Sequence, residues 1–392
     1  MTVPTSESFN AVVERLGKGS AIDSPRYVVA IPVKNEAERI ALCLEALALQ
    51  EGVNFADIGV VLLLNNCTDG TADRVREIAH LLPFAVELRS VTLVDGYANA
   101  GWARRLAMDA AAAWVQPDGL ILTTDADTLA HEEWIAANIK EIAAGHDAVA
   151  GYVMADPMEL MQLPPAILER GSLEWEYQQL AAELDARVDP EAHDPWPRHN
   201  QNCGASAAVT AAAYRAIGGL PPRPVGEDRA LFEMLRRIDG KIRHSLEVQV
   251  VTSARTDGRA SGGLADEIRL RTDPDHPCDD ALEVAMSTLR RAQWRSALRR
   301  QWHAREADAH AEVWAKKLRI SPEVFRTALG RHPYFGAFWA EIEAASPRLA
   351  WRLVTMAGLK RELRRIKRLV DSLRARAKAD AAVANEKKPQ AA

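Results

Sequence analysis

The sequence predicts an α/β protein with an open, mostly parallel sheet, helices on both faces and a C-terminal helical extension. From residue 26 to about 254, short apolar runs alternate with amphipathic stretches, a pattern typical of a parallel sheet covered by helices. After residue 263 the composition becomes helical, with many Trp, Arg and Ala residues. A chain of 392 residues is long enough for one large domain with an appendage, or for two domains.

Each expected strand is an apolar run that ends at polar or turn-forming residues. The runs cover 27–31, 58–64, 86–94, 119–124 and 148–153. In open α/β sheets ligands bind at the carboxyl ends of the strands. The polar residues that follow the first, second and fourth runs are therefore expected to share one edge: Asn35, Glu36, Asn65, Asn66, Asp69, Asp125 and Asp127.

Composition and charge exclude several protein classes. Hydrophobic residues make up 48% and charged residues 26%, as in an ordinary globular protein. The net charge of -5 argues against nucleic acid as a partner. Residues 346–392 hold 13 basic and four acidic residues, a net +9, which leaves −14 for the rest. Such asymmetry suggests a basic tail with a partner of its own.

The cysteines and the hydropathy indicate a reducing compartment without membrane spans. The four cysteines lie far apart and form no CxxC pair, so neither a zinc ribbon nor a disulfide framework is predicted. No signal peptide is recognised, and no run of eighteen apolar residues occurs. We expect a cytoplasmic protein that could also lie on the inner face of the membrane.

Two aspartates follow the fourth apolar run. Asp125 and Asp127 are two residues apart, so their side chains leave the same face of an extended chain. Two carboxylates suit Mg²⁺ or Mn²⁺, which complete their shells with phosphates and water. On its own, this spacing of two aspartates is weak evidence for a metal site. The alternative interpretation is a helix cap and a turn residue before Glu132 and Glu133.

An ordered series of motifs resembles the family 2 glycosyltransferases of the GT-A fold. The series comprises IPVKNE (31–36), NNCTDGT (65–71), GWARR (101–105), TDAD (124–127), YRAIGGLP (214–221) and GED (226–228). It extends over about 26–263. The resemblance implies four segments: an N-terminal extension (1–25), a GT-A domain (26–263), a helical extension (264–346) and a basic amphipathic helix with a tail (347–392).

The resemblance implies an inverting, metal-dependent transfer of a sugar from a nucleotide-diphosphate sugar to a hydroxyl acceptor, which could be a glycan such as a cell-envelope polysaccharide, a lipid or a small molecule. Asp125 and Asp127 would hold Mg²⁺ or Mn²⁺ on the diphosphate. Asp228, with Glu227 beside it, would be the general base. Alternatively, these two acids only begin a helix, where acidic residues are favoured.

The same resemblance implies where the donor binds. The donor-binding residues would be Pro32, Asn35, Glu36, Asn65, Asp69, Arg104, Asp125, Arg255 and Arg259. The two last arginines lie in a Gly-containing loop and could fork onto phosphate oxygens, although solvated surface arginines are the alternative. The family more often has an aspartate at the position of Asn65. Because an amide both donates and accepts, the choice of base stays open.

The segment 156–204 is expected to line the acceptor site. The residues singled out are Trp175, Trp196, Asn202 and Gly204. An aromatic ring can stack on the apolar face of a sugar, whereas packing in the core is the alternative for each tryptophan. Some relatives place a metal-binding histidine near Arg255, and none occurs here, so a third protein ligand is doubtful.

Two other functions remain open. A nucleotide-sugar-binding scaffold without catalysis fits the asparagines at 65 and 66. A sugar-phosphate nucleotidyltransferase normally opens with a Gly-rich loop, and the run after Ile31 contains no glycine. An oxidoreductase is disfavoured because no GxGxxG follows a strand.

The C-terminal segment has apolar residues every three or four positions from Leu349 to Leu373, alternating with Arg and Lys. This spacing permits self-association, packing on the body or binding to an anionic membrane.

Overall fold

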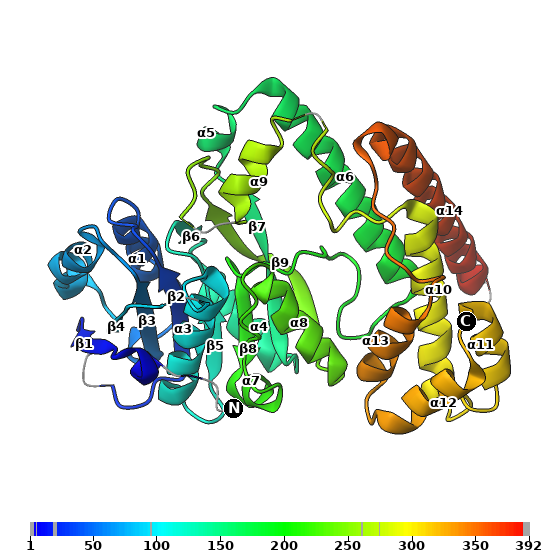
Figure 1. Ribbon diagram of the computed structural model, residues 1–392, viewed down its shortest axis with the longest axis horizontal. Helices are drawn as coiled ribbons and strands as arrows, with labels where there is room; N and C mark the ends of the chain where they lie inside the picture. The colour runs from blue at the N-terminus through cyan, green and yellow to red at the C-terminus, as the bar shows by residue number, and fades with distance from the viewer. Residues whose placement is uncertain are drawn as a thin grey trace, which may run out of the picture. The chain divides into compact units, whose positions relative to one another are not determined.

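The computed structural model describes residues 4, 6–18, 22–94, 96–259, 262–273 and 275–386 (Figure 1). Two compact units are present. The first unit comprises Met1–Leu163 and Gln201–Leu270, and the second comprises Pro164–Asn200 and Arg271–Ala392. Across the described part of the chain, no helix is long and apolar enough to cross a bilayer.

The first unit is built on a nine-stranded sheet with the order β1-β4-β3-β2-β5-β8-β7-β9-β6. The strands are β1 (Val12–Leu16), β2 (Tyr27–Val33), β3 (Ile58–Asn65), β4 (Ala85–Val91), β5 (Leu120–Thr123), β6 (Thr128–Ala130), β7 (Ala148–Ala155), β8 (Ala207–Thr210) and β9 (Ile242–Thr252). β1, β6 and β8 are antiparallel to their neighbours, and the other described strands run in one direction. The expected open, largely parallel sheet is confirmed.

Helices cover both faces of this sheet. Alternate residues of a strand point to opposite faces. Val28 and Ala30 of β2 therefore pack with α3, α7 and α8, whereas Val29 and Ile31 pack with α1, α2 and α4. The helical segments of the first unit are η1 (Ser6–Phe9), α1 (Ile40–Ala48), η2 (Phe55–Asp57), α2 (Thr71–Ile78), η3 (Ala79–Leu81), α3 (Ala100–Trp114), α4 (Trp134–Ala143), α5 (Pro157–Leu160), α7 (Ala211–Ala216), α8 (Glu227–Arg237) and α9 (Leu264–Leu270).

The carboxyl ends of the central strands meet at one edge, as the sequence predicts. β3, β2 and β5 are adjacent and parallel. The chain leaves β2 and β3 through Asn35 and Asn66, whose φ angles are 55° and 52°. Asparagine tolerates this left-handed conformation better than most residues. Both turns therefore bring polar groups back over the edge of the sheet.

The second unit is helical. Its segments are α6 (Pro165–Val188), α10 (Ala285–His303), α11 (Ala311–Leu318), α12 (Pro322–Arg331), α13 (Phe335–Ala345), η4 (Met356–Gly358) and α14 (Leu359–Glu386). Tyr177 and Leu184 of α6 form an apolar cluster with Leu359, Ile366 and Val370 of α14. The apolar face of the C-terminal helix is therefore covered within its own unit, which favours packing among the three alternatives for this helix.

The unit boundaries differ from the division that the sequence predicts. Residues 164–200, expected within the segment 26–263, pack with the C-terminal helices instead. Ion pairs reinforce this packing, because Glu183 binds Arg374 at 2.5 Å and Asp185 binds Arg295 at 2.7 Å. At the other end, β1, expected in an N-terminal extension, pairs with β4 and belongs to the sheet.

Candidate active site

The loops after β2 and β3 are joined by hydrogen bonds. The Oδ1 of Asn35 accepts from the backbone N–H of Thr68 at 2.8 Å, and its Nδ2 donates to the Thr68 hydroxyl at 3.2 Å. The hydroxyl of Thr71 accepts from the backbone N–H of Glu36 at 2.9 Å. These bonds hold the two loops together at the ligand-binding edge.

Asp69 acts as a brace between the same loops. Its carboxylate accepts from the backbone N–H groups of Ala37 and Thr71, each at 3.1 Å, and from the Thr71 hydroxyl at 2.5 Å. Burial raises the pKa of Asp69, but these hydrogen bonds outweigh it and the net pKa is lowered. The carboxylate expected to bind the donor is thus engaged by the protein.

Arg104 is the buried centre of the site. Its side chain projects from α3 and is only 7% exposed. The guanidinium donates hydrogen bonds to the carboxylates of Asp125, at 2.6 Å, and Glu227, at 3.0 Å. Its Nη1 also donates to the Thr123 hydroxyl at 3.0 Å and to the carbonyl of Gly204 at 3.1 Å. Burial opposes the charge, but Asp125 and Glu227 raise the pKa of Arg104 above its usual value. This guanidinium orients protein groups rather than meeting a ligand from solvent.

Asp127 is paired with an arginine from a distant loop. The Nη2 of Arg255 lies 2.9 Å from its carboxylate, and the same guanidinium forks onto Glu36, with one contact of 2.9 Å. Burial, followed by the charge of Asp125, raises the pKa of Asp127 to about 6, although Arg255 lowers it. Arg255 is therefore an engaged counter-ion of the site and not a solvated surface residue.

Glu159, which the sequence does not single out, fixes the start of the loop that carries Arg255. It accepts from the Ser253 hydroxyl and from the Ala254 backbone N–H, both at 2.7 Å, and pairs with Arg39 at 2.8 Å. These groups come from separate segments, and only the structure brings them together. No local sequence pattern could have identified this clamp.

Asp228 lies at the first turn of α8. The helix begins after Gly226, whose φ of 75° favours glycine. One carboxylate oxygen of Asp228 accepts from the Gly204 backbone N–H at 3.0 Å, and the other accepts from the Arg229 N–H at 2.7 Å. Glu227 is buried against Arg104. The two acids therefore begin a helix and also adjoin the group around Asp125.

Asn65 presents a polar atom with no partner. It ends β3, is 5% exposed, and its Oδ1 is buried with no hydrogen bond among the described residues. Buried polar atoms are seldom left unpaired. This oxygen can therefore accept a hydrogen bond from an N–H group of a ligand.

Two other residues expected to bind the donor have contacts or positions within the protein. Arg259 donates a hydrogen bond to the carbonyl of Asn35 at 3.2 Å, and Pro32 is part of β2.

The aspartate pair has the chemistry of a divalent-cation site with external ligands. Within the described part of the chain, no three His, Cys, Asp or Glu side chains converge on one point. Asp125 and Asp127 are 33% and 18% exposed, and the charge of one raises the pKa of the other. A cation would relieve this repulsion. Mg²⁺ and Mn²⁺ commonly complete such a shell with substrate phosphates and water.

Comparison with known proteins shows a family resemblance over part of the chain. Residues 28–198 match the family model described as Glycosyl transferase family 2. This match covers less than half of the chain, so it marks the segment as similar to that family. No curated protein matches the sequence. The match includes the loops after β2 and β3 and the aspartate pair, but it ends before Asp228 and Arg255.

Solved structures with low sequence identity are also similar. A mannosyltransferase, PcManGT from Pyrobaculum calidifontis in complex with GDP-Man and Mn²⁺, is 20% identical, with a TM-score of 0.44 over 84% of this chain and 88% of that chain. TarS 1-349 from S. aureus in complex with UDP-GlcNAc is 13% identical, with a TM-score of 0.44 over 89% of this chain and 92% of that chain.

The residues that the sequence predicts to bind an acceptor are divided between the two units. Asn202 and Gly204 belong to the first unit, and Trp175 and Trp196 belong to the second. The Oδ1 of Asn202 accepts from Arg236 at 2.8 Å. The tryptophans are 50% and 36% exposed, so neither is a fully buried core residue. Their role toward an acceptor stays a prediction.

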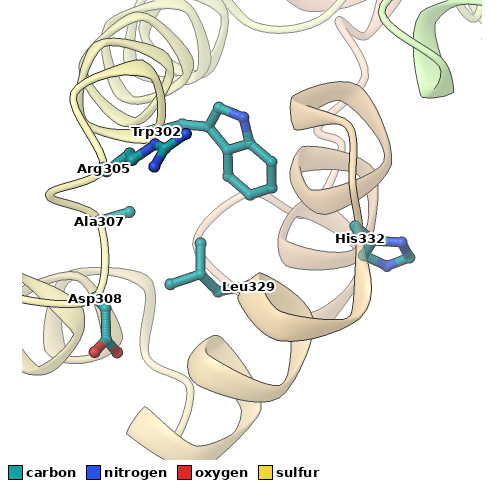
Figure 2. A pocket seen from close by; sticks show the side chains of 6 residues that line it. All are labelled: Trp302, Arg305, Ala307, Asp308, Leu329 and His332. Atoms are coloured by element: carbon teal, nitrogen blue, oxygen red, sulfur yellow. The ribbon is translucent and has the colours of Figure 1, made fainter.

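A cavity of about 390 Å³ lies within the second unit (Figure 2). It is lined by Trp302, Arg305, Ala307, Asp308, Leu329 and His332. Two of its polar side chains already have partners, because Asp308 pairs with Arg326 and His332 with Glu341. None of the lining residues belongs to the motif series.

Proposed function

We propose that this protein is an inverting, metal-dependent glycosyltransferase that moves a sugar from a nucleotide-diphosphate sugar to a hydroxyl acceptor. The observation that carries the proposal is the single charged cluster around Arg104. Asp125, Glu227 and Asp228 all interact electrostatically with this guanidinium, and Asp127 adjoins Asp125. The reaction requires two groups: a pair of carboxylates that binds the cation, and a carboxylate that accepts the proton of the acceptor hydroxyl.

On the donor side, Asp125 and Asp127 would hold Mg²⁺ or Mn²⁺, which neutralises charge on the departing nucleoside diphosphate. The unpartnered Oδ1 of Asn65 would accept an N–H of the base. Arg255 would exchange its contacts with Glu36 and Asp127 for phosphate oxygens. Arginine is suited to this exchange because its planar fork fits carboxylates and phosphates equally.

On the acceptor side, Asp228 would take the proton of the attacking hydroxyl. Each of its oxygens accepts one backbone N–H, which leaves a lone pair on each for this purpose. The acceptor oxygen forms a bond to the anomeric carbon on the face opposite the diphosphate, and the bond to the diphosphate breaks. A single displacement of this kind inverts the anomeric configuration.

The decisive experiment compares the wild type with Asp127→Asn on a panel of nucleotide sugars, with and without Mn²⁺. We expect one donor to raise the Tm of the wild type only when Mn²⁺ is present, and to release its nucleoside diphosphate. Asp127→Asn should fold but lose at least about 100-fold in release, whereas Asp73→Asn on the surface of α2 should be unaffected. Full activity of Asp127→Asn, or a response independent of metal, would contradict the proposal.

The same assay separates the two rival functions. A scaffold without catalysis would bind the nucleotide sugar and release no nucleoside diphosphate with any acceptor. A nucleotidyltransferase would instead release pyrophosphate from a nucleoside triphosphate and a sugar phosphate. Proton NMR of the product tests inversion, because the new glycosidic bond must have the anomeric configuration opposite to that of the donor.

We also propose an anionic membrane surface as the partner of α14. Five of its exposed basic residues, which we call the basic stripe, are Lys360, Arg361, Arg364, Lys367 and Arg368. Since the opposite, apolar face is buried, attachment would depend on charge and not on insertion. A cytoplasmic location would agree with this partner. Self-association through the heptad face is disfavoured because α6 already occupies that face.

A further inference from the structure

The guanidinium of Arg104 leaves almost no donor free. Its Nε donates to Glu227, its Nη1 donates to both Thr123 and Gly204, and its Nη2 donates to Asp125. Four of the five N–H groups of an arginine are thus used inside the protein, in four directions. A lysine has a single ammonium and could not reach all four acceptors at once.

The peptide group of Gly204 extends this network to the candidate general base. Its carbonyl accepts from Arg104 at 3.1 Å, while its N–H donates to a carboxylate oxygen of Asp228 at 3.0 Å. A displacement of the guanidinium would therefore move the residue that holds Asp228. Arg104 contacts the metal side of the site directly through Asp125, and it contacts the base side through Gly204.

The position of Gly204 excludes any side chain. A Cβ there would lie 2.5 Å from the Cζ of Arg104 and 2.7 Å from its Nε. These distances are far below van der Waals contact. The backbone packs directly on the guanidinium plane, so even one methyl group would push Arg104 away from its partners.

We propose that Arg104 and Gly204 together form a positioning unit that fixes the cation-binding carboxylate Asp125 and the general base Asp228 in one mutual geometry. The unit touches neither donor nor acceptor. It acts by coupling two halves of the site that come from distant parts of the chain, and it rests on the function proposed above. Arg104, the first of the two arginines in the GWARR motif, thereby has a different task from the donor binding that the resemblance implies.

The coupling predicts that damage to the unit impairs both halves together. Gly204→Ala displaces the guanidinium, Arg104→Lys keeps one positive charge without the fork, and Thr123→Val removes one acceptor at nearly constant shape. Gly330→Ala is the control, because a Cβ there meets no atom within 4 Å. The readouts are Mn²⁺ affinity by calorimetry, the pH profile of kcat/KM and thermal unfolding.

We expect Gly204→Ala and Arg104→Lys to remain folded, to bind Mn²⁺ at least 10-fold more weakly and to lose at least 100-fold in kcat. In Gly204→Ala the pH profile should also differ from that of the wild type, because the backbone N–H that holds Asp228 moves together with the guanidinium. The neighbouring Cys203 does not interfere with this readout, since burial and then the charge of Asp228 raise its pKa to about 12. Thr123→Val should show a smaller loss of Mn²⁺ affinity and a smaller change of the pH profile. This variant tests the proposal if the other two variants do not fold.

A purely structural role gives a different result. In that case the variants would unfold at lower temperature, yet Mn²⁺ affinity and the pH profile would match those of the wild type and of Gly330→Ala, and the inference would be overturned. A loss of Mn²⁺ affinity with an unchanged pH profile would also overturn it, since the halves would then be independent. If the wild type itself neither binds Mn²⁺ nor transfers sugar, the proposed function fails instead.

Discussion

At the residue scale, Asp127 carries an electrostatic cost in the absence of a cation. Its ordinary pKa of 3.8 is raised to about 6, first by burial and then by the charge of Asp125. A carboxylate with a raised pKa in the folded state binds protons more tightly when folded. Its contribution to stability is thus fully present below pH 3.8 and is lost as the pH rises through about 6.

This sign leads to a prediction for the metal-free protein. Asp127→Asn removes the charge at nearly constant shape, so we expect its Tm to exceed that of the wild type at pH 7.5. The difference should shrink as the pH falls from 7 to 5, because the wild-type carboxylate becomes protonated over that range. Scanning calorimetry with a chelator measures it, with Asp73→Asn as the exposed control. A difference that does not vary with pH would show that repulsion at Asp127 is not the cause.

Sequence reasoning singled out Arg104 and Arg255 but did not predict which side chains they contact. Arg104 was expected to bind the donor and Arg255 to bind its phosphates, and both contact carboxylates in the structure. A guanidinium fork fits either group, so residue type alone cannot distinguish the two. The contacts of Glu159 could not be predicted from the sequence, because its partners come from segments that are far apart in the chain.

At the element scale, the brace between the loops after β2 and β3 offers a separate test. Asp69→Asn would turn one acceptor oxygen into a donor facing backbone N–H groups. We expect stability to fall by about 1–3 kcal/mol and the affinity for a nucleoside diphosphate to fall, while kcat at saturating donor is retained. Denaturant unfolding, calorimetry with the nucleotide and initial rates measure the three quantities.

The outcome distinguishes bracing from direct donor contact. Thr71→Val, which removes only the hydroxyl that bonds to Asp69 and Glu36, is the matched variant and should show the same pattern at a smaller size. If Asp69→Asn lowers kcat at saturation and leaves stability intact, the carboxylate meets the donor directly and the brace is the wrong explanation.

The central strands were predictable and the marginal ones were not. The runs at 27–31 and 58–64 are continuously apolar, so they indicate buried parallel strands by themselves. β6 has only three residues, and β1 shows no regular alternation of polar and apolar residues and pairs with a strand about 70 positions away. α6 could pack its apolar face on either unit, because the apolar pattern of a helix does not specify its partner.

At the scale of the whole molecule, the charge asymmetry has a structural basis. Just over half of the net +9 of residues 346–392 lies on α14, whose apolar side is buried against α6. The helix is thus a part of the second unit and not a separable tail, so its deletion would uncover Tyr177 and Leu184. The charge itself stays exposed, since Arg364 and Lys367 have no acidic partner within 4 Å among the described residues.

Charge reversal tests the basic stripe without disturbing the core. Arg364→Glu with Lys367→Glu should weaken binding to phosphatidylglycerol vesicles by about 30-fold or more, at about 1 kcal/mol per basic residue. The control, Arg305→Glu with Lys316→Glu, makes the same change of charge elsewhere in the second unit and should retain most of the binding. Because contact is electrostatic, wild-type binding should also fall as NaCl rises from about 0.1 to about 0.5 M. Equal losses in both double variants would mean that net charge, and not the position of the stripe, attracts the membrane.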